Sequence, residues 1–137
     1  MLDNQQSFMT ENNTTQDEIL VIDDDSITIF LARKTLQSFR PGVIVNSFQD
    51  GKTALHYLLK RDSEARLIIL LDINMPDYSG WDFLTDYIAE NLSSPVFMFT
   101  SSIDPFDLAK SKTYDIVKGF ISKPLNKEKL DEIFKVN

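Results

Sequence analysis

The segment from Leu67 to Gly80 constrains the fold more than any other part of the chain. It reads LIILLDINMPDYSG, an apolar run that leads into Asp72 and is followed by residues typical of a loop. An apolar run of this kind, with β-branched members, indicates a strand buried on both faces of a parallel sheet. Asp72 would then lie at the carboxyl end of that strand, where open α/β sheets bind their ligands. Taken alone, an Asp at a strand end more often caps a turn.

Shorter apolar runs along the rest of the chain alternate with helical patterns. Four further strands are predicted, at Ile19–Ile22, Val43–Phe48, Pro95–Thr100 and Val117–Ile121. The intervening segments repeat apolar residues at steps of three and four, which is typical of amphipathic helices. These helices are expected at Ser26–Phe39, after Asp50, around Trp81–Ile88, from Asp104 to about Tyr114, and after Asn126. Such an alternation predicts an α/β fold, a three-layer sandwich around a five-stranded parallel sheet.

Composition limits the classes of function that the chain can have. Its 137 residues, 42% hydrophobic and 26% charged, suit a single globular domain. The absence of cysteine excludes disulfides and thiolate chemistry, and the net charge of -7 argues against binding to nucleic acid or anionic lipid. The polar segment 1–17 is expected to be a disordered extension of a folded domain at 18–137. With no signal-peptide or membrane-span pattern, a cytoplasmic location is expected.

Polar side chains end four of the five predicted strands. They are Asp23 and Asp24 after the first strand, Asp72 after the third, Thr100 after the fourth and Lys123 after the fifth. In a sheet of order 2-1-3-4-5 these strand ends converge on one crevice. Three crowded carboxylates repel one another and favour a bound cation, and Mg²⁺ prefers oxygen ligands of this kind.

Four motifs carry a family resemblance. They are ILVIDDD at 19–25, LLDINMPDYSG at 70–80, VFMFTSS at 96–102 and GFISKPL at 119–125. With these motifs in this order, the chain resembles the receiver domain of two-component response regulators. The resemblance implies a flavodoxin-like (βα)5 fold and covers nearly all of residues 18–137. It also implies function as a phosphorelay receiver, of the stand-alone type because little more than one helix follows Lys123.

The resemblance assigns roles to individual residues. Asp72 stands at the position of the phosphoacceptor. Lys123 matches the lysine that contacts the acceptor and then the phosphoryl group, and Thr100 matches the hydroxyl that hydrogen-bonds to that group. Phe120 occupies the place of the switch aromatic, whose ring moves when Thr100 moves. The family's Lys-Pro pair, here Lys123 and Pro124, is commonly joined by a cis bond.

The same resemblance implies a magnesium site. Asp23 and Asp24 match the acidic pair that binds Mg²⁺, with Asp72 and the backbone carbonyl of Asn74 as further ligands. Asp25 is expected to be a helix cap, because Asp23 and Asp24 already fill the matching positions.

The implied partners are proteins. The phosphoryl group would come from a sensor histidine kinase or a histidine phosphotransfer protein. A downstream protein target would bind the face made by the fourth helix, the fifth strand and the fifth helix. No direct nucleic-acid partner and no membrane insertion are expected. The protein would be a phosphoacceptor that assists its own phosphotransfer and dephosphorylation, not an enzyme with turnover.

Three other functions fit parts of the pattern. A degenerate receiver would bind partners without phosphorylation, but the set of acidic, Thr and Lys residues is complete. A metal-dependent phosphohydrolase of the haloacid dehalogenase type would need a second acid where the chain has Asn74. A flavin-binding module would need a phosphate loop rich in Ser, Thr and Gly, whereas Asp23, Asp24 and Asp25 would repel phosphate.

Overall fold

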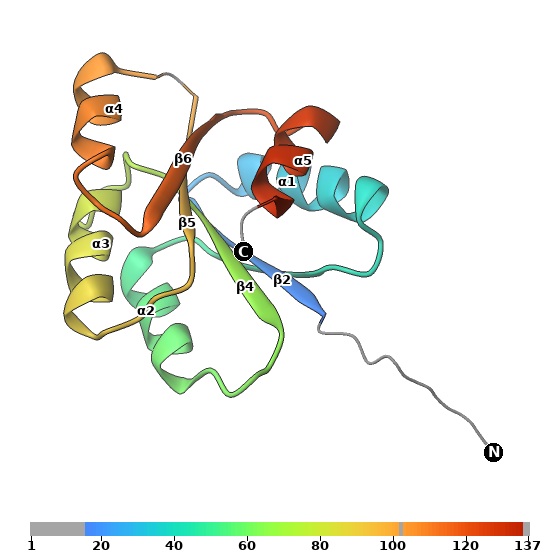
Figure 1. Cartoon of the computed structure of the whole chain (residues 1–137), viewed down its shortest axis with the longest axis horizontal. Helices are drawn as coiled ribbons and strands as arrows, with labels where there is room; N and C mark the ends of the chain where they lie inside the picture. The colour runs from blue at the N-terminus through green and yellow to red at the C-terminus, as the bar shows by residue number, and fades with distance from the viewer. Residues whose placement is uncertain (1–15, 102, 136–137) are drawn as a thin grey trace.

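Five parallel strands form a single sheet whose neighbours run in the order β3-β2-β4-β5-β6 (Figure 1). The computed structural model describes residues 16–101 and 103–135. Counted along the chain, the strand order is 2-1-3-4-5, so the predicted flavodoxin-like topology is confirmed. The strands are β2 (Asp17–Ile22), β3 (Ile44–Phe48), β4 (Arg66–Leu71), β5 (Val96–Thr100) and β6 (Val117–Ser122).

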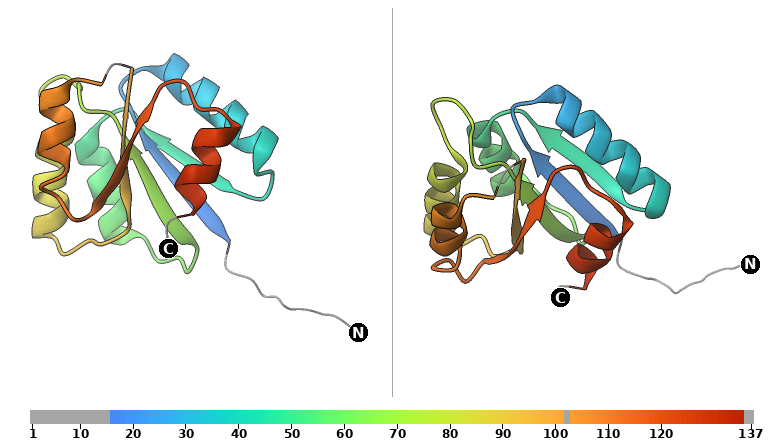
Figure 2. Two further views of the ribbon diagram at one scale, coloured as in Figure 1. Left: turned by 45° about the horizontal axis from the view of Figure 1, so that its top comes forward. Right: turned by 90° about the horizontal axis from the view of Figure 1, so that it is seen from above.

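Five helices connect and cover the strands. They are α1 (Ser26–Phe39), α2 (Gly51–Lys60), α3 (Gly80–Ala89), α4 (Pro105–Ser111) and α5 (Lys127–Phe134). Figure 2 shows α1 and α5 on one side of the sheet and α2, α3 and α4 on the other. The predicted three-layer sandwich is therefore confirmed.

Each central strand is buried on both of its faces. In β4, Ile69 and Leu71 face the core that α2 and α3 cover, while Ile68 and Leu70 face the core under α1 and α5. All four of these side chains are fully buried. Because both faces are apolar, the strand has no solvent-facing alternation, which is why the sequence reads as a continuous apolar run.

Polar side chains cap the starts of the helices. Asp25 accepts a hydrogen bond from Ile27 N at 3.0 Å and caps α1, as expected for this residue. Asp104 and Asn126 likewise cap α4 and α5. Ser79 and Asp82 form a reciprocal capping box at the start of α3. These caps pair backbone N–H groups that helical hydrogen bonding leaves unsatisfied, and they fix where each helix begins.

Two element boundaries differ by more than one residue from those expected. β2 begins at Asp17, the last residue of the segment expected to be disordered, because its carboxylate pairs with the Arg66 guanidinium at 2.8 Å. Gln16, in the same segment, is also described, and its carbonyl accepts a hydrogen bond from Arg66 N at 2.8 Å. Residues 1–15 lie outside the described residues. α4 ends at Ser111, before the predicted Tyr114, and a turn follows in which Tyr114 N donates to Ser111 O. Tyr114 then packs against the core from outside the helix.

In the described ranges 16–101 and 103–135, helices are too short or too polar to cross a membrane.

Candidate functional site

Asp72 lies at the carboxyl end of β4, beside the end of β2. Its backbone N–H donates to Ile22 O at 2.9 Å, so the sheet ladder fixes the residue as the last paired position of the strand. Asp23 is held in the same way from the other side, by a hydrogen bond from its N–H to Phe48 O at 3.1 Å. The two carboxylates therefore emerge side by side at one edge of the sheet, as the strand order requires.

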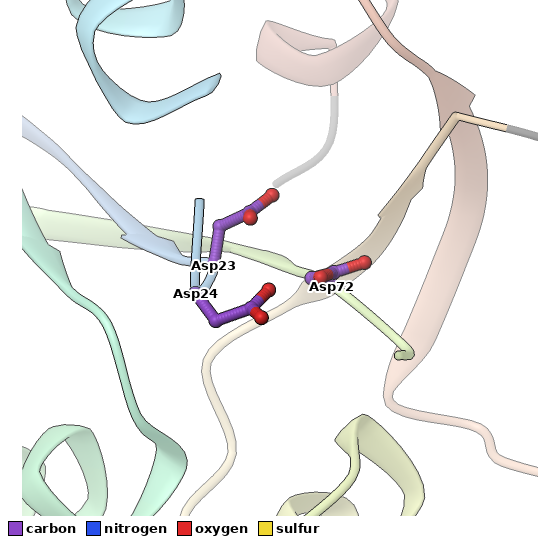
Figure 3. Close-up of side chains that lie close together, drawn as sticks. All are labelled: Asp23, Asp24 and Asp72. Carbon is purple, nitrogen blue, oxygen red and sulfur yellow. The ribbon is translucent and has the colours of Figure 1, made fainter. Parts of the chain in front are cut away.

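Three carboxylates converge at this edge (Figure 3). Asp23, Asp24 and Asp72 each offer an oxygen, and these oxygens lie within 4.8 Å of one another. Asp23 is fully buried and Asp72 is 6% exposed, whereas Asp24 is open to solvent. The predicted cluster is therefore present, with two of its members removed from water and the third at its rim.

Lys123 brings an ammonium group to the same site from the end of β6. Its Nζ lies 2.6 Å from Asp23 Oδ2 and 3.6 Å from Asp72 Oδ1. The backbone N–H of Lys123 donates to Thr100 O at 2.7 Å, which holds the ends of β5 and β6 together. The bond between Lys123 and Pro124 is cis, as the resemblance implied. Lys123 thus contacts the expected acceptor, but its nearer partner is Asp23.

The electrostatics of the site oppose ionisation of Asp72. Burial, followed by the nearby charge of Asp23, raises the pKa of Asp72 from 3.8 to about 6. Lys123 and a hydrogen bond from the backbone N–H of Asn74 act in the opposite direction without cancelling this effect. A cation among the three carboxylates would favour the charged form, because it would offset both the burial and the repulsion.

The residues present fit a hard divalent cation. Asp23 Oδ2 is buried and accepts no hydrogen bond of good geometry from the described residues, although the Lys123 ammonium lies close enough for an ion pair. An oxygen of this kind retains lone pairs for a metal. Asp24 supplies a carboxylate open to solvent, which suits an ion that keeps several of its waters. The donor set consists of oxygen ligands, as Mg²⁺ prefers.

Thr100 and Asn74 complete the set of predicted residues around Asp72. Thr100 ends β5 and is 3% exposed. Asn74 follows Asp72 in the loop, with its side chain in solvent. Phe120 lies on β6, half-buried against the core, and borders a small hollow of about 160 Å³ together with Leu108 and Ser111 of α4.

Several aromatic and apolar side chains outside the site are exposed to solvent. Phe106 on α4 is 74% exposed. Ile27, Phe30 and Leu31 on α1 are also exposed, at 67%, 58% and 49%, and they form one stripe at helical spacing. The sequence does contain a sign of this exposed stripe: the apolar residues of α1 cover more of the helix surface than the side that faces the core. His56, the one histidine of the chain, is exposed on α2.

The chain is similar in sequence to proteins of one known family. The family model of the response regulator receiver domain matches residues 19–135. The chain is 28% identical to the two-component response regulator ORR41 of Oryza sativa subsp. japonica, over 84% of this chain and 89% of that protein. It is 32% identical to hybrid signal transduction histidine kinase L of Dictyostelium discoideum, over 86% of this chain and 7% of that protein. The chain therefore spans only a small part of that kinase.

A solved structure shows the same fold. The two component response regulator from Cytophaga hutchinsonii superposes with a TM-score of 0.77 at 30% identity, over 89% of this chain and 96% of that one. The family match covers all the strand-end residues that line the site, from Asp23 to Lys123. The chain belongs to the response regulator receiver domain family.

Proposed function

We propose that the protein is a phosphorylation-controlled switch in which Asp72 accepts a phosphoryl group in a Mg²⁺-dependent reaction. The observation that carries the proposal is the environment of its carboxylate, with Asp23 and Asp24 on one side and the Lys123 ammonium on another. Phosphoryl transfer depends mainly on positioning and on neutralising charge, and this arrangement supplies both.

The proposed donor is a phosphohistidine of a sensor kinase or phosphotransfer protein. An Asp72 carboxylate oxygen attacks phosphorus, the phosphorus–nitrogen bond breaks, and the imidazole of the donor leaves with the bonding electron pair. Bound Mg²⁺, held by Asp23, Asp24, Asp72 and the Asn74 carbonyl, would neutralise charge on the phosphoryl oxygens. Such donors obtain phosphate from ATP, so we propose that the reaction takes place in the cytoplasm.

Lys123 and Thr100 then take the roles that the family resemblance implies. The Lys123 ammonium, which leans toward Asp23, is close enough to Asp72 to contact a phosphoryl oxygen after a small side-chain movement. The Thr100 hydroxyl would hydrogen-bond to the same group. Movement of Thr100 would free space for the Phe120 ring, which already borders the hollow between β6 and α4. Phosphorylation would thereby shift the population toward an active conformer.

The output is proposed to be a protein contact on the face made by α4, β6 and α5. Phe106 supports this surface, because a side chain that is 74% exposed on α4 can bury its ring against a partner. It also lies on the rim of a hollow of about 590 Å³ that reaches Asn74 and Met75 in the loop after Asp72. The acceptor loop and the output face are therefore adjacent.

The competing functions are less well supported. A degenerate receiver would not need the converging carboxylates and ammonium. A phosphohydrolase of the haloacid dehalogenase type would need an acid at the position of Asn74, and the Asp23–Asp25 segment would repel the phosphate of a flavin. We therefore propose a phosphoacceptor that assists its own chemistry, not a turnover enzyme.

Incubation with a small phosphoryl donor such as phosphoramidate tests this proposal by intact mass. With Mg²⁺, wild-type protein should gain the mass of one phosphoryl group, and with a chelator it should gain none. Asp72→Asn should gain none under either condition. Asp25→Asn is the matched control, since it removes a neighbouring carboxylate that only caps α1 and should leave the adduct in place.

Two results would contradict the proposal. One is an adduct of equal yield on Asp72→Asn, which would move the acceptor to another residue. The other is a wild-type protein that forms no adduct and whose Trp81 fluorescence does not respond to beryllofluoride with Mg²⁺. The second result would favour the degenerate receiver, which binds partners without phosphorylation.

A further inference from the structure

The two ends of the loop that follows Asp72 are joined by a backbone hydrogen bond. Gly80 N, at the start of α3, donates to Ile73 O at 2.8 Å. The two ends approach so closely that a Cβ on Gly80 would lie 2.4 Å from the carbonyl oxygen of Asp72. Ile73 and Met75 are buried and anchor the first half of the loop in the core. The second half is solvent-facing and needs other restraints.

A γ-turn lies at the tip of this loop. Tyr78 N donates to Pro76 O at 2.7 Å, and Asp77 between them has a positive φ of 66°. A three-residue turn with positive φ at its centre is the rarer and more strained of the two γ-turn types. Strained backbone of this kind persists only where the surroundings hold it, and it gathers near functional sites.

Tyr78 supplies that restraint by joining the loop to two helices. Its hydroxyl donates to Asp86 Oδ2 of α3 at 2.5 Å. Its ring lies against Gly51, the first residue of α2, so closely that a Cβ there would be 2.7 Å and 2.8 Å from two ring carbons. Tyr78 therefore fixes the position of the turn relative to both α2 and α3.

The restraints lie on both sides of Asn74 in the chain. Asn74, whose carbonyl is a proposed ligand, lies between the buried Ile73 and the clamped Tyr78. Its backbone N–H also donates to the Asp72 carboxylate. The N–H and the carbonyl of Asn74 therefore both have a role at the site, the carbonyl as a proposed ligand. A change in the backbone conformation of the loop would change the direction in which these two groups point. Outer-shell partners of this kind orient metal ligands without touching the metal.

We propose that Tyr78 is a positioning residue for the magnesium site, which it serves through the backbone of Asn74. The inference rests on the proposed function, because it needs a metal that the Asn74 carbonyl helps to bind. Tyr78 acts from outside the site, by holding the strained turn at Asp77 between α2 and α3. A cation would thus meet a carbonyl that is already oriented.

Mg²⁺ titrations of unphosphorylated protein, followed by Trp81 fluorescence, test the proposal. Tyr78→Phe keeps the ring and removes only the bond to Asp86, and it should raise the Mg²⁺ Kd about three- to tenfold, below the usual effect of losing a direct outer-shell partner. The matched control is Tyr87→Phe on α3, which also removes one tyrosine hydroxyl bond, to Ser94 O at 2.7 Å, and should leave the Mg²⁺ Kd unchanged.

A double-mutant cycle separates this role from a general loss of stability. Asp86→Ala should raise the Mg²⁺ Kd as much as Tyr78→Phe does, and the double variant should be no worse than either single variant. Asp86→Asn keeps an acceptor oxygen and should restore a Kd near that of wild type. Gly51→Ala, which pushes on the Tyr78 ring from α2, should also weaken binding.

The outcomes distinguish this inference from the function on which it rests. A wild-type protein that neither binds Mg²⁺ nor accepts a phosphoryl group overturns the proposed function and the role of Tyr78 with it. A wild-type protein that does both, with a Tyr78→Phe variant of equal Mg²⁺ Kd, overturns only the role of Tyr78. Equal shifts in Tyr78→Phe and Tyr87→Phe would also overturn it, since they would indicate a general structural effect.

Discussion

At the scale of single residues, the folded structure disfavours the ionised form of Asp72. Its pKa is raised from 3.8 to about 6 by burial and by Asp23. Above pH 6 the carboxylate is charged in both the folded and the unfolded chain. The full cost of burying this charge then lowers the free energy of unfolding. As the pH falls from 6 toward 3.8 the folded protein takes up the proton first, and the penalty disappears.

Asp72→Asn should therefore stabilise the metal-free protein at pH 7. Each unit of pKa shift corresponds to about 1.4 kcal/mol, but Asn remains buried and Lys123 loses a partner, so we expect a gain of about 1 to 2 kcal/mol. Urea unfolding in a chelator should show the gain at pH 7 and its loss near pH 4. A variant that is less stable than wild type at pH 7 would mean that the Lys123 ion pair outweighs burial and repulsion.

At the scale of elements, the junction between β4 and α3 has the least room for change. A Cβ added at Gly80 would lie 2.4 Å from Asp72 O and 3.0 Å from Ile73 Cα, both of them backbone atoms that cannot move aside alone. This close approach lets α3 begin directly beside the acceptor. The glycine is needed for space, because its φ is not positive.

Gly80→Ala should lower the free energy of unfolding by about 2 to 3 kcal/mol, the upper part of the range for overpacking. Gly42→Ala is the matched control, since a Cβ at Gly42 meets nothing within 4 Å. Urea unfolding of the two variants compares them directly. If Gly80→Ala unfolds at the same urea concentration as Gly42→Ala, the loop accommodates the methyl group and the close contact does not constrain the chain.

At the scale of the whole molecule, one end of the sheet holds the candidate site and the other holds a buried hydrogen-bond cluster. The candidate site occupies the carboxyl end of the strands. Glu18, near the opposite end of β2, is 2% exposed and accepts hydrogen bonds from Tyr57 at 2.6 Å, Asn46 at 2.8 Å and Arg61 at 2.9 Å. Burial tends to raise the pKa of Glu18, but these hydrogen bonds lower it below 4.5. The cluster ties α2 to β2 and β3.

Glu18→Gln should destabilise the protein without changing the site. Removing the charge leaves the Arg61 guanidinium without its buried partner, which should cost about 2 to 4 kcal/mol at pH 7. Because the folded pKa is depressed, the contribution of Glu18 is present above pH 4.5 and is lost as the pH falls through the folded pKa, so the difference between variant and wild type should shrink there.

Two controls accompany the Glu18 experiment. Asp17→Asn disrupts the more exposed pair with Arg66 and should cost less than about 1 kcal/mol in urea unfolding. The Mg²⁺ Kd of Glu18→Gln should equal that of wild type, since the substitution lies at the far end of β2. A weakened Kd would show that the two ends of the sheet are coupled.

Much of this architecture follows from local patterns in the sequence. The apolar run before Asp72, the helical stripes and the caps at Asp25, Asp104 and Asn126 each depend on residues within one element, so short-range physics predicts them. The converging set of Asp23, Asp24, Asp72, Thr100 and Lys123 was also predicted, because parallel strands bring their carboxyl ends to one edge. The end of α4 was not, because Tyr114 leaves the helix to pack against distant residues.

What the sequence determined by itself was therefore the fold and the identity of the residues at the strand ends. The tertiary structure decided which groups meet across distance: that Lys123 lies nearer to Asp23 than to Asp72, that Tyr78 joins the acceptor loop to α2 and α3, and that Phe106 faces solvent. The physical reason is that such pairings depend on how elements dock, and docking is a property of surfaces assembled from residues far apart in the chain.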